Sequence, residues 1–178
     1  KQVNDTVGHA AGDQLLVEAA DRLKHALRDS DTVARLGGDE FVVICADLQN
    51  RDGAELLAEG VLGSLSAPFS IQNREFFVTA SIGMAFYPDD GEESQSLLKN
   101  ADLALYQAKD AGRAGYKFFT SKMDQAANKR LTMVSYLRHA IERDELYVRY
   151  QPIVHLDTGD MVGVEALLRW HNPKLGEV

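Results

Sequence analysis

The chain has 178 residues, a hydrophobic content of 45% and a formal net charge of −8, which is typical of one soluble globular domain with a sizeable core. The acidic balance argues against a nucleic-acid partner, because nucleic-acid-binding surfaces carry basic patches. No apolar run reaches the ~18 residues of a membrane span and no leader peptide opens the chain, so we expect no membrane contact within this segment.

Cellular location is suggested by the one cysteine. Cys45 lies in a run that predicts a buried strand and can form no internal disulfide, so we expect a reducing, cytoplasmic location. Because the chain starts at Lys1 rather than at methionine and stops at Val178 just after a strand-like run, we expect it to be a piece of a longer protein. An N-terminal membrane anchor in that parent protein is left open.

The first segment predicts a loop followed by a helix. Residues 1–13 contain Gly8 and Gly12 and show no helical or alternating period, which favours a loop. Asp13 is well placed to cap the helix that follows. The apolar face of this helix is formed by Leu15, Leu16, Ala19, Leu23, Ala26 and Leu27.

A glycine pair between two strand-like runs, residues 32–34 and 41–45, predicts a β-hairpin. Glycine accepts positive φ and leaves no side chain in the way of a bulky ligand. Asp39 and Glu40 then lie at the tip of this hairpin, where their hard oxygen ligands suit Mg²⁺ carrying a nucleotide phosphate. The alternative is that both are ordinary polar residues of a turn.

Helices and strands alternate through the next segment. Apolar periodicity predicts helices over residues 53–64 and 94–112, and strand-like composition marks residues 68–72, 74–87 and 116–119. In the longest of these strands, alternation predicts a core set of Phe76, Val78, Ala80 and Ile82.

The last third of the chain begins with a predicted helix over residues 121–143. Strand-like runs follow at residues 146–150, 153–155 and 162–168, and turn residues occupy 157–159. This arrangement predicts a connecting helix followed by strands that a turn separates.

Three motifs in the first two thirds carry a family resemblance. The run from Arg35 to Phe41 contains Gly-Gly-Asp-Glu-Phe, and the chain resembles the GGDEF family of bacterial diguanylate cyclases, which make cyclic di-GMP and pyrophosphate from two GTP. The family's NDxxGHxxGDxxL signature is matched by Asn4, Asp5, Gly8, His9, Gly12, Asp13 and Leu16, and its ADxALYxAKxxGRN signature by Ala101, Asp102, Ala104, Leu105, Tyr106, Ala108, Lys109, Gly112 and Arg113.

The resemblance implies a role for each matched polar residue. Asp39 would bind metal, and Glu40 would help deprotonate the attacking 3′ hydroxyl. Asn4 and Asp13 would hold the guanine, whose adjacent N1–H and N2–H donors suit a carboxylate acceptor. His9 would lie near the base, with a structural hydrogen bond in the loop as its alternative role.

Two further pairs of residues match family positions. Lys109 and Arg113 would reach the triphosphate, although cations at a helix end also favour the helix dipole. Ala114 stands where the family usually has Asn, so the resemblance implies reduced phosphate binding. Arg28 and Asp31 match the RxxD inhibitory site that binds cyclic di-GMP, with a weak surface ion pair as the alternative.

The last segment resembles the start of an EAL domain, the cyclic di-GMP phosphodiesterase module that often follows GGDEF. Its motifs here are YQPIV and EALLRW. In that family Glu165 would be a metal ligand, and Gln151 and Arg169 would contact the substrate. An EAL domain resembles a TIM-type barrel of ~250 residues, so only its beginning would be present.

Together these resemblances imply an α/β (α+β) fold with a mostly antiparallel central sheet and helices on both faces, like nucleotide cyclases and polymerase palms. The family's first strand, with a metal-binding Asp just before the segment that begins at Lys1, would be missing. We expect a GGDEF domain over residues 1–119, a linker helix over 120–143 and the truncated EAL start over 144–178. The segment by itself is expected to catalyse neither reaction.

In the intact protein, the resemblance implies Mg²⁺ (or Mn²⁺) as cofactor, GTP and cyclic di-GMP as ligands, and a homodimer in which each domain holds one GTP. One alternative is a silent GGDEF domain that senses GTP or cyclic di-GMP and regulates the phosphodiesterase. The other is a non-catalytic interaction scaffold.

Overall fold

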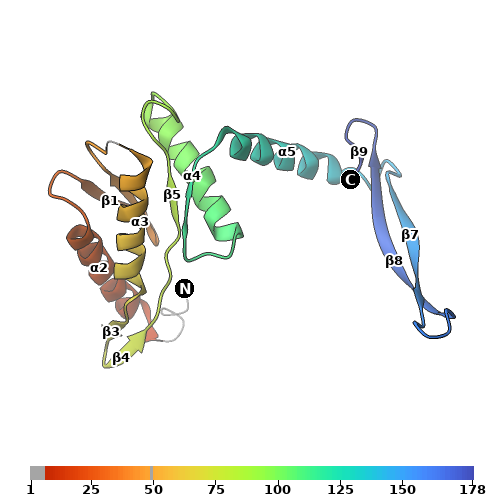
Figure 1. Cartoon of the computed structure of the whole chain (residues 1–178), viewed down its shortest axis with the longest axis horizontal. Helices are drawn as coiled ribbons and strands as arrows, with labels where there is room; N and C mark the ends of the chain where they lie inside the picture. Colours follow the sequence, from red (N-terminus) through yellow and green to blue (C-terminus); the bar gives the residue numbers. More distant parts are fainter. Residues whose placement is uncertain (1–6, 49) are drawn as a thin grey trace. The chain divides into compact units, whose positions relative to one another are not determined.

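The structure, a computed structural model, describes residues 7–48 and 50–178 (Figure 1). The chain divides into a first compact unit that ends at Met123 and a second from Asp124 to Val178. No helix in the described part of the chain is long and apolar enough to cross a membrane.

The first unit is a mixture of helices and short strands, which confirms the predicted α/β class. Its elements in chain order are α2 (His9–Ala26), β1 (Thr32–Gly37), β2 (Glu40–Ile44), α3 (Arg51–Ser66), β3 (Phe69–Ile71), β4 (Arg74–Phe76), β5 (Ile82–Met84), α4 (Ser94–Asp110) and β6 (Tyr116–Phe118).

The described strands of the first unit pair two by two rather than in one continuous sheet. The β1–β2 and β3–β4 pairs are antiparallel hairpins, as predicted. The β5–β6 pair is parallel, with Ile82 opposite Tyr116, because α4 carries the chain back along β5 and β6 starts from the same end. Two of the three described strand pairs of this unit are antiparallel, in keeping with the predicted mostly antiparallel arrangement.

The predicted strand over residues 74–87 is interrupted in the structure. β4 ends at Phe76 and β5 begins at Ile82, and residues 77–81 have no strand assignment. The predicted alternation nevertheless persists, because Phe76, Val78, Ala80 and Ile82 are partly buried and pack against the core. Side-chain burial therefore continues through a segment whose backbone has no strand partner among the described residues.

The approach of β5 to α4 requires glycine at position 83. A Cβ atom there would overlap the carbonyl oxygen of Ala101 and the backbone nitrogen of Leu105, and would lie 2.7 Å from the Cα of Leu105. The backbones of strand and helix thus touch directly, which only a residue without a side chain permits.

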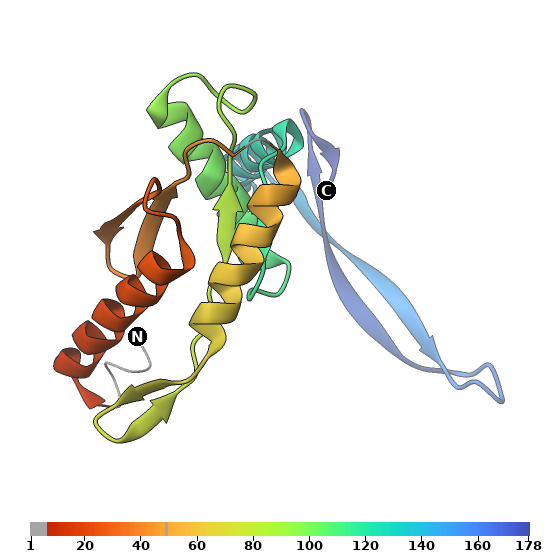
Figure 2. The same cartoon turned by 60° about the vertical axis from the view of Figure 1, so that its left-hand side comes forward.

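The core of the first unit lies where α2 and α3 pack together beside the β3–β4 hairpin (Figure 2). Alanine and leucine from α2, valine and leucine from α3 and two large residues of β3 fill it. Its buried members are Ala11, Ala19, Leu23, Val61, Leu65, Phe69 and Ile71.

Arg22 of α2 ties this core to the end of α3. Its guanidinium lies 3.7 Å from the centroid of the Phe69 ring, a cation–π contact. Its nitrogens donate hydrogen bonds of 2.6–3.1 Å to carbonyl oxygens in the last turn of α3 and the segment after it, where backbone carbonyls lack helical partners. The acceptors are Ser64, Ala67 and Pro68, with the Glu18 carboxylate completing the set at 2.6 Å.

The second unit contains most of α5 (Ser121–Leu137) and an antiparallel sheet of β7 (Leu146–Val154), β8 (Met161–Asn172) and β9 (Gly176–Glu177). The helix predicted to reach residue 143 ends at Leu137, and turns follow. The strands of this sheet are antiparallel, unlike those of a TIM-type barrel. The turn between β7 and β8 is too short for the crossover connection that parallel strands need.

β7 runs unbroken through Gln151 and Pro152, where the sequence predicted a break. Proline has no backbone N–H and therefore suits an edge strand. β7 is such a strand, because β8 is its one neighbour in the described sheet.

Replacing Arg22 tests the clamp between α2 and α3. Arg22→Met keeps the length of the side chain and removes every donor, so we expect the free energy of unfolding to fall by about 2–3 kcal/mol. Arg22→Lys keeps the charge and loses the planar fork, and should lose about half as much. Urea denaturation measures both; a loss below about 0.5 kcal/mol for Arg22→Met, the range of an ordinary surface change, would contradict the clamp.

Candidate functional site

The hairpin of β1 and β2 places two carboxylates at an exposed tip. Arg35 pairs with Phe41 and Gly37 with Glu40, with a register shift between Arg35 and Gly37. Gly38 and Asp39 therefore form the turn. Gly38 has φ +54°, and a Cβ atom there would meet nothing within 4 Å. Glycine is thus favoured here by backbone conformation rather than by lack of space.

Asp39 and Glu40 are both exposed, Asp39 in the turn and Glu40 as the first residue of β2. Two carboxylates on a turn that exposes its backbone can supply hard oxygen ligands to a divalent cation. Within residues 7–48 and 50–178, no three His, Cys, Asp or Glu side chains gather as a ligand set. The described tip therefore fits part of a metal site.

α2 begins earlier than predicted, and Asp13 therefore does not cap it. The helix begins at His9, and its N-cap is Gly8 with φ +90°, so Asp13 lies within the helix and does not cap it. Glycine is an acceptable N-cap, which the sequence pattern did not reveal because the first turn adds only one buried apolar residue, Ala11. His9 and Asp13 are both exposed and lie four residues apart, on one helix face.

The first two residues of the NDxxGHxxGDxxL signature, Asn4 and Asp5, lie outside the described residues. Helix capping was the alternative role for the Asp13 carboxylate, and the position of Asp13 within the helix excludes it.

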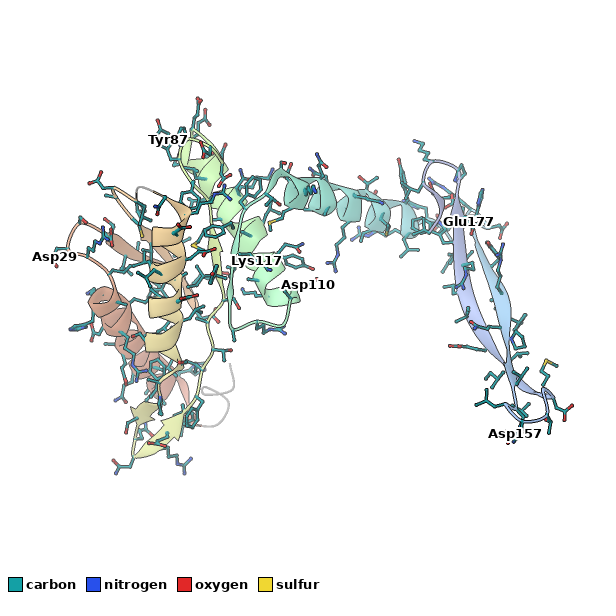
Figure 3. The ribbon with its side chains drawn as sticks, in the orientation of Figure 1. Asp29, Tyr87, Asp110, Lys117, Asp157 and Glu177 are labelled. Atoms are coloured by element: carbon teal, nitrogen blue, oxygen red, sulfur yellow. The ribbon has the colours of Figure 1, made fainter. Side chains whose placement is uncertain are left out.

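Arg28 and Asp31 form the turn that leads from α2 into β1 (Figure 3, beside the labelled Asp29). The Arg28 backbone N–H donates to Asp31 Oδ2 at 3.0 Å, and the Asp31 N–H donates to the Arg28 carbonyl at 2.9 Å. Asp31 thus stabilises the turn through the backbone. Its charge also reaches Cys45, whose thiol pKa is raised to about 11 by burial first and by Asp31 second, with Arg28 opposing.

The structure corrects the predicted position of Cys45. The residue follows β2 and is half-buried, rather than lying within a buried strand.

Lys109 and Arg113 lie at the C-terminal end of α4. The labelled Asp110 marks this end of the helix in Figure 3. Lys109 belongs to the last turn and Arg113 to the loop, and both are exposed. The Arg113 N–H donates to the Ala108 carbonyl at 3.1 Å, and Gly112 has φ +115°. The predicted glycine stop is confirmed, and it presents both cations at one helix end.

Ala114 adopts the left-handed conformation, with φ +51°. Side chains other than glycine, asparagine and aspartate rarely take this conformation, because Cβ then crowds the backbone. The Asn that the family usually has at this position tolerates it.

The second unit places its three predicted site residues on one face of the β7–β8 hairpin. Gln151 is directly opposite Glu165, and Arg169 lies four residues along β8 from Glu165. Since side chains alternate along a strand and paired residues share a face, all three lie on the same side. Gln151 and Glu165 are exposed and Arg169 is half-buried.

A buried carboxylate that the sequence did not reveal holds the base of this hairpin. Glu145 accepts hydrogen bonds from Trp170 Nε1 at 2.8 Å and from Asn172 Nδ2 at 2.9 Å. These two bonds, that from Trp170 first, lower the pKa of Glu145. The spacing of Trp170 and Asn172, two apart on one strand, was the available signal for a shared partner.

A second polar contact lies at the same end of the sheet. Tyr147 Oη donates to Glu177 Oε2 at 2.7 Å, which lowers the pKa of Glu177 and raises that of Tyr147. His171 Nδ1 lies 3.0 Å from Glu177 Oε1. β9 is thereby connected to both longer strands.

Fold and site together define an α/β domain of the nucleotide-cyclase type with a carboxylate-bearing hairpin, followed by a separate β-sheet module. The family described as "Diguanylate cyclase, GGDEF domain" matches residues 1–115, and the EAL domain family matches residues 135–178. The chain belongs to the GGDEF diguanylate cyclase family and continues into the start of an EAL domain. Members of this family generally use a divalent metal.

Curated relatives match the chain across both of its parts. The chain is 48% identical over 176 residues to a protein named bifunctional diguanylate cyclase/cyclic di-GMP phosphodiesterase MucR from Pseudomonas aeruginosa, covering 99% of this chain and 26% of the relative. It is 43% identical to the cyclic di-GMP phosphodiesterase NbdA of that organism, covering 99% and 22%. The chain thus spans about a quarter of the length of these relatives.

Solved structures agree on the fold. The GGDEF domain of TpbB (YfiN) from P. aeruginosa matches with a TM-score of 0.68 and 37% identity, over 71% of this chain and 74% of that one. The GGDEF domain of DgcB from Caulobacter crescentus, solved in complex with c-di-GMP, matches with a TM-score of 0.56 and 28% identity, over 66% and 70%.

The left-handed loop position predicts a stabilising substitution. Ala114→Asn should raise the free energy of unfolding by about 0.5–1 kcal/mol, since Asn tolerates this conformation better than Ala. Ala111→Asn is the matched control, because Ala111 has φ −75° and should gain nothing. Chemical denaturation of both variants checks this, and equal effects at the two positions would contradict the backbone explanation.

The buried carboxylate predicts a pH dependence. Because the folded-state pKa of Glu145 is lowered from 4.5, its contribution is present above that value and disappears as the pH falls through the lowered pKa. Glu145→Gln should flatten this acid-side loss, whereas Glu142→Gln, at a side chain 76% exposed, should leave it unchanged. Trp170, the one tryptophan, reports unfolding by fluorescence. Parallel pH profiles for wild type and Glu145→Gln would contradict this role.

Proposed function

We propose that the protein containing this chain condenses two GTP into cyclic di-GMP and pyrophosphate through its GGDEF domain. The observation that carries the proposal is the hairpin tip, where a left-handed glycine turn exposes Asp39 and Glu40 next to each other. Phosphoryl transfer needs little covalent chemistry from the protein beyond positioning and charge neutralisation, which is what such a tip can provide.

Asp39 is proposed as a ligand for Mg²⁺, with Mn²⁺ as an alternative. When bound, such a cation neutralises the charge of the triphosphate. Glu40 accepts the proton of the 3′ hydroxyl that attacks the α-phosphate of the other GTP. The guanine is held by Asn4 and by Asp13, whose carboxylate matches the base's two adjacent donors, and His9 lies one helical turn from Asp13.

Lys109 and Arg113 are proposed to bind the triphosphate. Their exposed position at one helix end supports this, because the β- and γ-phosphates need cationic partners and Arg can donate in pairs. Ala114 next to them removes the usual Asn amide and should weaken, without abolishing, phosphate binding.

One domain holds one GTP, so two domains must face each other for both bonds to form. We therefore propose a homodimer as the active species. Arg28 and Asp31 are proposed as the inhibitory site for cyclic di-GMP. The Arg28 side chain is exposed on the turn that Asp31 stabilises, and a guanidinium suits phosphate or guanine.

The EAL part is proposed to belong to a cyclic di-GMP phosphodiesterase in the same protein. Glu165 would be a metal ligand there, and Gln151 and Arg169 would contact the substrate. Their common face on the β7–β8 hairpin supports this assignment.

A second candidate is a GGDEF domain that senses GTP or cyclic di-GMP and regulates the phosphodiesterase. Ala114 at the phosphate end favours it, and the relative NbdA is named for phosphodiesterase activity alone. The exposed Asp39 and Glu40 pair favours synthesis instead.

Two substitutions in the full-length protein separate these candidates. With Mg²⁺ and GTP, Asp39→Asn should lower cyclic di-GMP formation by about 100-fold or more, because it weakens the hold on the cation that would neutralise the developing phosphate charge. Glu165→Gln should leave synthesis intact and stop hydrolysis of cyclic di-GMP. Asp89→Asn, at another exposed turn, is the control. Wild-type protein that makes no cyclic di-GMP, yet hydrolyses it with a GTP-dependent rate, would favour the sensor.

A further inference from the structure

The arginine that precedes the glycine pair is folded onto the turn. Nε and Nη2 of Arg35 both donate to the carbonyl oxygen of Gly38, at 2.9 Å and 2.7 Å. The two donors of one guanidinium thus meet at a single acceptor within the turn. Arg35 itself sits on β1, opposite Phe41 and immediately before the register shift.

Because the acceptor is the Gly38 carbonyl, the contact restrains the peptide group between Gly38 and Asp39. A peptide group is planar, so fixing the carbonyl oxygen of Gly38 also fixes the N–H of Asp39. With that plane held, the direction in which the Asp39 carboxylate leaves the backbone is restricted. Gly38, with φ +54°, has no side chain that could restrict the turn instead.

Backbone pairing and core packing hold the hairpin together without help from the Arg35 side chain. Four pairs from Thr32↔Ile44 to Arg35↔Phe41 hold β1 and β2 together, and the core packs against Val33 and Phe41. Arg35 is exposed. Its contact with Gly38 is therefore poorly placed to stabilise the fold and well placed to order the tip.

We propose that Arg35 is a positioning residue for the metal–nucleotide site, which it serves by fixing the Gly38–Asp39 peptide so that Asp39 and Glu40 are pre-organised. This inference rests on the proposed function of the hairpin tip. It assigns to Arg35 a role through the backbone, without contact with the reacting atoms.

The test compares Arg35→Met, which keeps the aliphatic stem and loses both donors, with Arg35→Lys, which keeps one cationic donor. In the full-length protein with Mg²⁺ and GTP, Arg35→Met should lower kcat by about 10- to 100-fold, as expected for a misplaced catalytic group. KM for GTP should change less than about threefold, since the guanine and phosphate contacts lie elsewhere. Arg35→Lys should recover part of kcat.

Binding of Mn²⁺, followed by electron paramagnetic resonance with a non-hydrolysable GTP analogue, provides a readout apart from turnover. Arg35→Met should weaken Mn²⁺ binding about tenfold, because the cost of ordering Asp39 then falls on binding. Arg74→Met, beside the Gln72–Asn73 turn of the other hairpin, is the matched control and should change neither quantity.

Wild-type kcat and Mn²⁺ affinity in Arg35→Met would overturn the inference, and so would a loss of both together with a large fall in Tm, which would make the role structural. If wild-type protein forms no cyclic di-GMP, the proposed function fails, while the Mn²⁺ titration still decides the role of Arg35. If wild type is active and Arg35→Met equals it, the function stands and the inference fails.

Discussion

The first unit depends on the contact between the Arg22 guanidinium and the end of α3. One side chain satisfies carbonyls that the helix leaves without partners, covers the Phe69 ring and keeps α2 against the core. Because α2 also carries His9 and Asp13, the position of the proposed guanine site follows from this clamp. The packing of α2 and the proposed recognition of the base are thus linked through one residue.

The tip of the β1–β2 hairpin is held in a different way from the core. Its strands are held by backbone pairing and by the core beneath Val33 and Phe41, whereas the turn itself is exposed and restrained by a side chain. Stability and function are thereby separated, since the exposed turn can be shaped for a ligand without loss of packing. The same separation holds in the second unit, where Glu145 holds the base of the β7–β8 hairpin and the exposed polar face lies further along its strands.

Local patterns predicted the parts of this structure that local chemistry determines. The glycine pair gave the β1–β2 hairpin, and Gly112 gave the end of α4. Predictions failed at two places: residues 77–81, whose pairing depends on a strand distant in the sequence, and the start of α2. Asp13 looked like a cap because Gly8 gives no side-chain signal for one. The Glu145 cluster joins residues 25 and 27 positions apart, beyond any periodicity.

Synthesis is tested most directly by offering the full-length Glu165→Gln protein, in which hydrolysis of cyclic di-GMP should be stopped, an equimolar mixture of GTP and ATP with Mg²⁺ and identifying the products by mass spectrometry. We expect cyclic di-GMP and pyrophosphate, with ATP unchanged, because Asn4 and Asp13 are proposed to bind guanine and Asp39 and Glu40 to support condensation of GTP. A cyclic adenine dinucleotide, or the absence of any cyclic dinucleotide under conditions in which GTP binds, would contradict it.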